Sequence, residues 1–258
     1  MVLDRQFDRL RQVWAYWSVF ADVKSIKTYR KLLFSPQELP KTVELAVRAL
    51  PGRRLICRTG TADVTTLWET FYFKFHLPNR PLNRPACIVD LGANVGYTAA
   101  HFARLYPSAR AIAVEMDRDN HHLCAQNTLG LLSSSDVLEA AVWNENGTLN
   151  YSDADSNAYS LCSSQLTNEP KRSATAKTLD TIFDERGVDR VDYLKMDIEG
   201  AEAAVLGNEM RWAERVKQIS VEIHPPATFE NCASALASSG FRCEKSNRRS
   251  SALMAWRP

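Results

Sequence analysis

The chain has 258 residues, of which 45% are hydrophobic and 24% charged, a composition typical of an ordinary soluble protein with one sizeable core. A formal net charge of +2 gives no electrostatic case for nucleic-acid binding, and no apolar run is long enough for a transmembrane segment. The six cysteines form no C-x-x-C pair and the charged N-terminus lacks a signal-peptide core, which favours free thiols and a cytoplasmic protein.

The N-terminal segment, residues 3–34, repeats apolar side chains at helical spacing. The repeat consists of Leu3, Phe7, Leu10, Trp14 and Trp17. Spacings of three and four predict one or two amphipathic helices with an apolar stripe. We expect this stripe to pack on its own domain. The alternatives are docking of a second subunit, which would give a homodimer, of a membrane surface or of an acceptor.

Shorter elements are expected next. Ser35-Pro36 begins a short helix that ends before Pro51, a strand follows over 54–58, and an aromatic helix covers 65–76. Three prolines between residues 78 and 85 indicate a linker.

We therefore expect two domains. Residues 1–80 form a helical extension with a short strand-turn-helix, and residues 81–258 form an α/β domain that binds a nucleotide-like ligand.

The stretch from Cys87 to Tyr106 combines a strand, a glycine turn and a helix. The apolar run that begins at Cys87 leads to Asp90, then to a turn between Gly92 and Gly96, and then to a helical pattern. Glycines allow close backbone approach, and a helix N-terminus offers unpaired N–H groups to a polar ligand. This is the first unit of a nucleotide-binding α/β sheet.

The spacing within this turn distinguishes between ligands. A dinucleotide fingerprint has a glycine where this chain has Asn94. Asp90, an acid two residues before Gly92, suits a ligand with a positive amine better than one with two phosphates. S-adenosylmethionine is such a ligand, although a turn of this kind taken alone also fits an ordinary strand–helix connection.

The next two strands carry further ligand positions. An apolar strand over 111–115 ends in Glu115, where a carboxylate can accept hydrogen bonds from ribose hydroxyls. The alternative is a surface acid at the start of a helix. A third strand is expected over 137–142, with the adenine beyond its end near Ala141. The polar stretch 152–177 is expected to be a surface excursion with short strands, or else disordered.

Two later strands end in polar residues. A buried strand should be apolar, yet the strand over 191–197 carries Lys195 and Asp197, which share a face by alternation. The strand over 218–224 likewise carries Glu222 and His224. If the two strands are neighbours, these four side chains converge at one end of the sheet; a purely structural Lys–Asp pair is the alternative.

Taken together, these stretches resemble the FkbM family of S-adenosylmethionine-dependent methyltransferases. The resemblance is carried by VDLGANVGYTA, VEMDRDNHHLCAQN, TLDTIFDERGVDRVDYLKMDIEGAEAAVL and ISVEIHP, and it covers roughly residues 87–226. The segment 54–71 also resembles the strand-turn-helix that precedes the fold in some members, whereas residues 1–50 lie outside the resemblance.

The resemblance implies a fold, a cofactor and a reaction. It implies a Rossmann-like, doubly wound sheet of the class I methyltransferases with strand order 3-2-1-4-5-7-6, the seventh strand being antiparallel. It also implies methyl transfer from S-adenosylmethionine, usually to a hydroxyl oxygen and often on a sugar or polyketide.

The expected site residues fall into three groups. Cofactor-binding positions are Asp90, Gly92, Asn94, Gly96, Tyr97, Glu115 and Ala141. Catalytic positions are Asp197, His224, Lys195 and Glu222. A general base is expected among Asp197, His224 and Glu222, with Lys195 keeping the neighbouring carboxylates ionised. Alternatively, the oxygens of Asp197, Glu199, Glu202 and Glu222 bind Mg²⁺.

The sequence therefore predicts an O-methyltransferase that acts on a small-molecule or glycan acceptor. The alternatives are methyl transfer to nitrogen or carboxylate, a nicotinamide dehydrogenase, and a non-catalytic cofactor-binding scaffold. Asn94 and the K-x-D-x-E-G-A-E stretch argue against the dehydrogenase.

Overall fold

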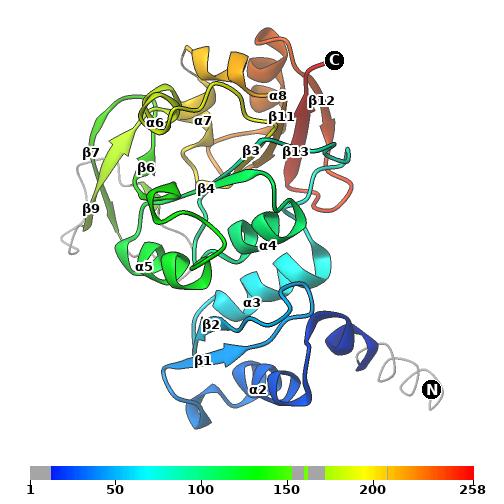
Figure 1. Cartoon of the computed structure of the whole chain (residues 1–258). Helices are drawn as coiled ribbons and strands as arrows, with labels where there is room; N and C mark the ends of the chain where they lie inside the picture. Colours follow the sequence, from blue (N-terminus) through cyan, green and yellow to red (C-terminus); the bar gives the residue numbers. More distant parts are fainter. Residues whose placement is uncertain (1–12, 153–159, 162–171, 208) are drawn as a thin grey trace. The chain divides into compact units, whose positions relative to one another are not determined.

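The computed structural model describes residues 13–152, 160–161, 172–207 and 209–258 (Figure 1). The chain divides into two compact units, Met1–Phe75 and His76–Pro258. The roles expected for residues 1–80 and 81–258 remain predictions.

Among the described residues, the second unit contains a seven-stranded sheet of order β12-β13-β11-β10-β3-β4-β5. Its strands are β3 (Cys87–Leu91), β4 (Arg110–Glu115), β5 (Val137–Glu139), β10 (Tyr193–Met196), β11 (Gln218–Glu222), β12 (Arg242–Lys245) and β13 (Ala252–Trp256). β13 pairs antiparallel with both β11 and β12, whereas β11, β10, β3, β4 and β5 pair in parallel. Numbered in chain order, the strands have the order 3-2-1-4-5-7-6, which confirms the predicted fold class.

Helices cover both faces of this sheet. They are α4 (Tyr97–Leu105), α5 (Arg118–Asn127), α6 (Leu179–Arg186), α7 (Glu202–Leu206) and α8 (Phe229–Ser238), with short 3-10 turns η3 (Ser134–Asp136) and η4 (Arg211–Arg215). Val89 and Met196 lie in the core cluster that includes residues of α6, α7 and α8. Ile88 packs instead with Phe102 of α4. Strand side chains alternate between faces, so β3 and β10 place apolar residues on both sides of the sheet, with Asp90 and Lys195 as buried charged exceptions.

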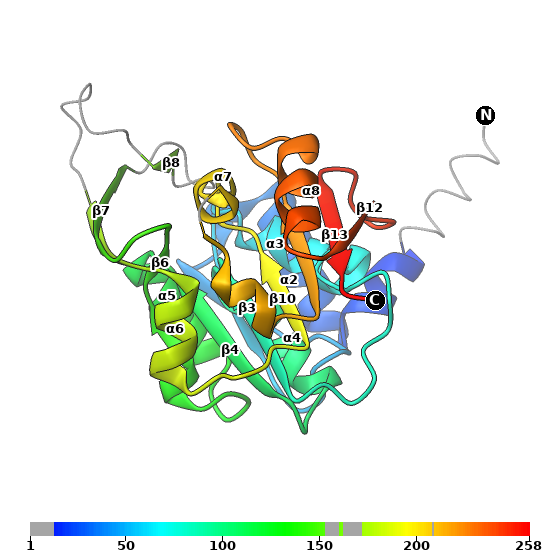
Figure 2. The same ribbon diagram turned by 90° about the horizontal axis from the view of Figure 1, so that it is seen from above.

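A smaller sheet follows β5. It has the order β6-β9-β7-β8 and consists of β6 (Ala141–Val142), β7 (Gly147–Ser152), β8 (Ser160–Leu161) and β9 (Arg172–Lys177). Figure 2 shows β6, β7 and β8 on the side of the unit away from β12 and β13. The excursion predicted over 152–177 contains β8 and β9, and its residues 153–159 and 162–171 lie outside the described residues.

The single strand predicted over 137–142 is wrong. Residues 137–139 pair with β4 in the main sheet, whereas residues 141–142 pair with β9 in the small one. The backbone N–H of Ala140 donates to the carbonyl of Glu115 at 3.0 Å, where the chain passes between the two sheets. Residues 137–142 are apolar apart from Glu139, and they carry no mark of such a change of partner.

The first unit is built on aromatic packing. Residues 13–19 are helical and are followed by α2 (Val23–Phe34), η1 (Pro36–Glu38), β1 (Thr42–Leu45), β2 (Leu55–Arg58), α3 (Asp63–Trp68) and the π-helix η2 (Glu69–Phe73). Tyr29 stacks on Trp68 with ring centroids 5.4 Å apart, and Tyr16 and Phe20 pack against the same pair.

Two expectations for this unit are wrong. The helix expected between Pro36 and Pro51 is only the short η1, followed by β1, because Val43 and Leu45 alternate inward and β1 pairs antiparallel with β2. The stripe through Trp14 and Trp17 does not pack inward, since these side chains are 77% and 39% exposed. The helix buries Tyr16 instead, against the rings above; Leu3, Phe7 and Leu10 lie outside the described residues.

The described residues include five cysteines and no helix suited to a membrane. Cys57, Cys87, Cys124, Cys232 and Cys243 are free thiols, and Cys162 lies outside the described residues. Where the structure describes the chain, its helices are too short or too polar to cross a lipid bilayer.

Candidate functional site

The glycine turn after β3 lies at the carboxyl edge of the main sheet. Gly92 has φ +70°, and a Cβ built there would be 1.7 Å from the carbonyl oxygen of Asp197. Gly96 has φ +84°, and its Cβ would be 2.9 Å from the Cα of Cys124 in α5. Both glycines are thus required by the packing of the chain itself, a reason that the sequence analysis did not foresee.

Glu115, at the end of β4, faces this turn. Its Oε2 accepts a hydrogen bond from the backbone N–H of Asn94 at 2.8 Å, and its Oε1 accepts one from that of Asp117 at 2.9 Å. Burial raises the pKa of Glu115 to about 7, even though both hydrogen bonds favour the charged form. Asn94 has φ +50°, and its buried Oδ1 has no hydrogen-bond partner among the described residues.

Beneath the turn lies a buried ion pair. Lys195 of β10 stands opposite Asp90 of β3 in the parallel register, and its Nζ lies 3.1 Å from Asp90 Oδ1. The hydroxyl of Thr98 donates to the other oxygen of Asp90. Burial alone would lower the pKa of Lys195, but the charges of Asp90 and Asp197 raise it overall. Lys195 also donates to the carbonyl of Gly92 at 3.3 Å, so it joins the turn to the next strand.

Five charged side chains gather where β10 and β11 end. Asp197 Oδ2 lies 3.3 Å from Lys195 Nζ. The Nε2 of His224 lies 3.9 Å from Asp197 Oδ1, and 3.6 Å from carboxylate oxygens of both Glu199 and Glu222. The structure therefore brings together Lys195, Asp197, Glu222 and His224, because β10 and β11 are parallel neighbours.

Glu202 fixes the orientation of His224. Its carboxylate is completely buried, accepts hydrogen bonds from the backbone N–H groups of Ile198 and Gly200, and lies 2.9 Å from His224 Nδ1. Burial lowers the pKa of His224, but the bond to Glu202 and the charges of Glu199 and Asp197 outweigh it and raise the pKa to about 9. His224 is thus protonated at neutral pH in this arrangement.

Arg249 is a site residue that the sequence analysis missed. It lies between β12 and β13, and its Nη2 is 2.6 Å from Glu222 Oε1. Burial raises the pKa of Glu222 to about 7, the charge of Asp197 adds to this, and Arg249 opposes it. The segment from Ser246 to Ser251 carries no pattern that indicates such a contact. The role of Glu202 could have been suspected only from its place in the K-x-D-x-E-G-A-E stretch.

The side chains of Tyr97 and Ala141, two predicted cofactor positions, pack inside the protein, and their cofactor roles stay predictions. Tyr97 is the first residue of α4 and is almost completely buried. Ala141 lies in β6, where its side chain belongs to a small cluster with Tyr151 and Ala174. The adenine contact expected of Ala141 therefore stays a prediction.

The residues around the turn fit the groups of S-adenosylmethionine. That ligand offers hydroxyl and amine donors, and the turn offers the buried Asn94 Oδ1 together with the Glu115 carboxylate. A metal ion also has candidate ligands, because one donor atom each of Asp197, Glu199 and His224 lies within 4.8 Å of the others.

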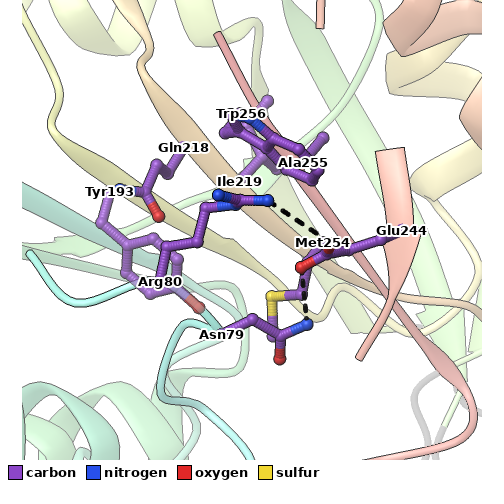
Figure 3. A pocket seen from close by; sticks show the side chains of 9 residues that line it. All are labelled: Asn79, Arg80, Tyr193, Gln218, Ile219, Glu244, Met254, Ala255 and Trp256. Carbon is purple, nitrogen blue, oxygen red and sulfur yellow. Dashed lines mark hydrogen bonds and ion pairs between the residues drawn. The ribbon is translucent and has the colours of Figure 1, made fainter. Parts of the chain in front are cut away.

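A small cavity lies at the opposite edge of the sheet, near the amino ends of β10 and β11 (Figure 3). Its volume of about 10 Å³ has room for roughly one water molecule. Arg80 stacks on Trp256 there at 3.8 Å, and Asn79 donates to Glu244 at 3.0 Å. The predicted linker is thus fastened to the sheet, and the cavity is too small for a cofactor.

Comparison with known proteins identifies relatives by sequence. The 2-O-methyltransferase NoeI of Sinorhizobium fredii (strain NBRC 101917 / NGR234) is 26% identical over 159 residues, which cover 55% of this chain and 65% of NoeI. Methyltransferase sdnD of Sordaria araneosa is 26% identical over 186 residues, which cover 59% of this chain and 70% of sdnD. The match thus spans less than two thirds of NoeI.

Similar solved structures include precorrin-6y C5,15-methyltransferase from Geobacter metallireducens GS-15. It is 10% identical, with a TM-score of 0.40 over 72% of this chain and 86% of that one. The model of the methyltransferase FkbM domain matches residues 90–243, which include the glycine turn, Glu115 and the charged cluster around His224. Because this match covers more than half of the sequence, the chain belongs to the FkbM methyltransferase family.

Proposed function

We propose that this chain transfers a methyl group from S-adenosylmethionine to a hydroxyl oxygen of a sugar, glycan or related secondary metabolite. The observation that carries the proposal is the charged cluster of Asp197, Glu222 and His224, which adjoins the glycine turn through the contact of Gly92 with Asp197. The similarity to NoeI, a 2-O-methyltransferase, supports oxygen as the acceptor atom.

The cofactor supplies a methyl group that its positive sulfur has already activated. Methyl transfer would break the S–CH₃ bond, form an O–CH₃ bond and pass the hydroxyl proton to a carboxylate of the site. Glu115 would accept hydrogen bonds from ribose hydroxyls, and Asn94 Oδ1 would accept one from a donor of the cofactor. Holding the acceptor oxygen, methyl and sulfur in line is the main contribution of the protein.

Asp197 is the base that this arrangement favours. Its Oδ2 lies 3.3 Å from Lys195 Nζ and its Oδ1 lies 3.9 Å from His224 Nε2, whereas the pKa of His224, about 9, leaves that side chain protonated at neutral pH. A positioned base contributes a rate factor of roughly 10²–10⁴. Glu222, beside Arg249, is the second candidate.

Replacing Asp197 tests the role of the base. We expect Asp197→Ala to lower turnover by roughly 10²–10⁴-fold and to leave the affinity for S-adenosylmethionine nearly unchanged. The fold should survive, because Lys195 keeps Asp90 as its partner at 3.1 Å. The measurements are S-adenosylhomocysteine formation on a panel of hydroxylated glycans and calorimetric titration with the cofactor.

Asp189→Ala is the matched control, since Asp189 is an exposed acid that precedes the opposite end of β10. Unchanged turnover by Asp197→Ala would remove Asp197 from the mechanism. Failure of the wild-type chain to bind S-adenosylmethionine would overturn the proposed function as a whole. A product methylated on nitrogen or on a carboxylate would overturn the choice of a hydroxyl acceptor.

As the alternative to a carboxylate base, we propose that Mg²⁺ assists the transfer, with Asp197, Glu199 and Glu222 as its oxygen ligands. The metal would lower the pKa of the acceptor hydroxyl. The three residues whose donor atoms lie within 4.8 Å of one another are Asp197, Glu199 and His224, so two of the three proposed ligands belong to this group. We expect EDTA to reduce turnover and added Mg²⁺ to restore it; turnover that is indifferent to both would contradict the metal-assisted version.

A further inference from the structure

Charge is distributed unevenly between the two units. Residues 1–75 contain thirteen lysines and arginines against seven acidic residues, whereas residues 76–258 contain nineteen against twenty-three. The small net charge of the chain thus hides a basic first unit and an acidic second unit. A basic surface attracts polyanions and anionic lipid headgroups.

Helix α2 presents much of this positive charge on one face. Its inner face buries Ser25, Tyr29 and Leu32. At 100° per residue the opposite face contains Val23 and Phe34, which are 51% and 69% exposed. The same face contains Lys24, Lys27, Arg30 and Lys31, all of them exposed. Apart from the pair of Lys31 with Glu38, no ion pair is recorded for these four basic residues within the described part of the chain.

The helix over residues 13–19 adds exposed aromatic rings to the same unit. Trp14 is 77% exposed, and Trp17 lies beneath the guanidinium of Arg48, which is 5.7 Å from the ring centroid. Large apolar side chains beside long basic ones are the composition of helices that lie in a membrane interface. The apolar rings enter the headgroup region, and the lysine and arginine stems extend toward the phosphates.

We propose that the face of α2 formed by Val23, Phe34 and the four basic residues, with Trp14 and Trp17 as further anchors, docks on an anionic lipid surface. A second copy of this chain is the less favourable occupant. A two-fold interface brings the same patch of both copies together, so it would set the four basic side chains against themselves. The proposal is independent of the methyl-transfer reaction.

Vesicle co-sedimentation of the full chain tests the proposal. We expect binding to phosphatidylcholine vesicles that contain about one third phosphatidylglycerol, and much weaker binding to phosphatidylcholine alone. Lys24→Glu/Lys27→Glu should lower the partition coefficient between vesicles and water at least about tenfold, because each basic residue near an anionic surface contributes roughly a fivefold factor. Phe34→Ser should weaken it as well, and raised salt should reverse binding.

Matched controls make the same changes in charge and hydrophobicity at positions away from the face. Lys41→Glu/Lys74→Glu makes the same change in charge at exposed positions of the same unit, and Leu129→Ser removes a side chain that is 74% exposed in the second unit. Both controls should bind like the wild type.

Three results would overturn the proposal. One is an absence of binding to either kind of vesicle. Another is an equal loss in the Lys24→Glu/Lys27→Glu and Lys41→Glu/Lys74→Glu variants, which would show that net charge alone matters. The last is sedimentation of the wild-type chain as a dimer that Phe34→Ser converts to monomer, which would assign the face to a second copy. These experiments measure vesicle binding or molecular mass and not methyl transfer. A negative result would therefore leave the proposed function intact.

Discussion

At the scale of single residues, Glu115 is held in a costly state. It is buried at the end of β4 and accepts two backbone hydrogen bonds, yet its pKa is raised to about 7. Hydrogen bonds from ribose hydroxyls would favour the charged form. Cofactor binding should therefore deprotonate Glu115 at any pH at which this carboxyl group is protonated in the free protein.

This predicts a pH-dependent affinity for S-adenosylmethionine. A group whose folded pKa is about 7 is protonated below that pH, so the dissociation constant should rise by up to about tenfold per pH unit below pH 7 and level off above it. Calorimetric titrations between about pH 5.5 and 8 measure this. Glu115→Gln should bind more weakly and lose this dependence, and a wild-type affinity that is constant across the range would contradict the assignment.

Several of these residues were visible in the sequence, and others were not. Asp90, Glu115 and the pair of Lys195 with Asp197 stand out because each is a polar residue in, or at the end of, an otherwise apolar strand. Arg249 does not stand out, since its contact with Glu222 depends on how the turn between β12 and β13 folds back. A contact set by tertiary structure leaves no local pattern.

At the scale of elements, the turn after β3 is coupled to the end of β10. The carbonyl oxygen of Asp197 occupies the space that a side chain at Gly92 would need, and Lys195 bonds the carbonyl of Gly92 from the same strand. The cofactor turn and the proposed base are thus parts of one packed structure.

Substitution of Gly92 should expose this coupling. We expect Gly92→Ala to destabilise the protein by at least about 2 kcal/mol, because a positive φ and a clash with backbone add together. Gly187→Ala is the control: Gly187 has φ +61° but no atom within 4 Å of its Cβ, so only the conformational cost of about 1 kcal/mol applies. Urea denaturation measures both, and equal losses would contradict the packing argument.

The sequence predicted helices and strands well where periodicity and caps agree. Thr178 caps α6 through the N–H of Thr181, and Gly187 ends it in the left-handed region, as that pattern indicates. The prediction of a helix after Pro36 was wrong. The alternation of Val43 and Leu45 that marks β1 is only two residues long, and the polar residues around it hid this strand pattern. The change of sheet at Ala140 could not be predicted, since apolar residues suit either sheet.

At the scale of the whole molecule, the predicted cofactor and catalytic residues all belong to the second unit. We therefore expect a fragment of residues 76–258 to fold and to bind S-adenosylmethionine with nearly the affinity of the full chain. Circular dichroism and calorimetry measure this, with the full chain as the reference. An unfolded fragment, or a loss of binding beyond about tenfold, would show that residues 1–75 are needed for the site.

The small sheet also has a consequence for how this protein can be altered. Val142 and Lys177 are partners in the pairing of β6 with β9, so the excursion leaves the domain and returns to it at neighbouring points. A segment grafted between these two points would begin and end at paired positions, and it would have to replace the contacts of Tyr151 and Arg172 with Asp117. Chimaeras made at this junction, assayed on hydroxylated glycans, would show whether the excursion contributes to acceptor preference.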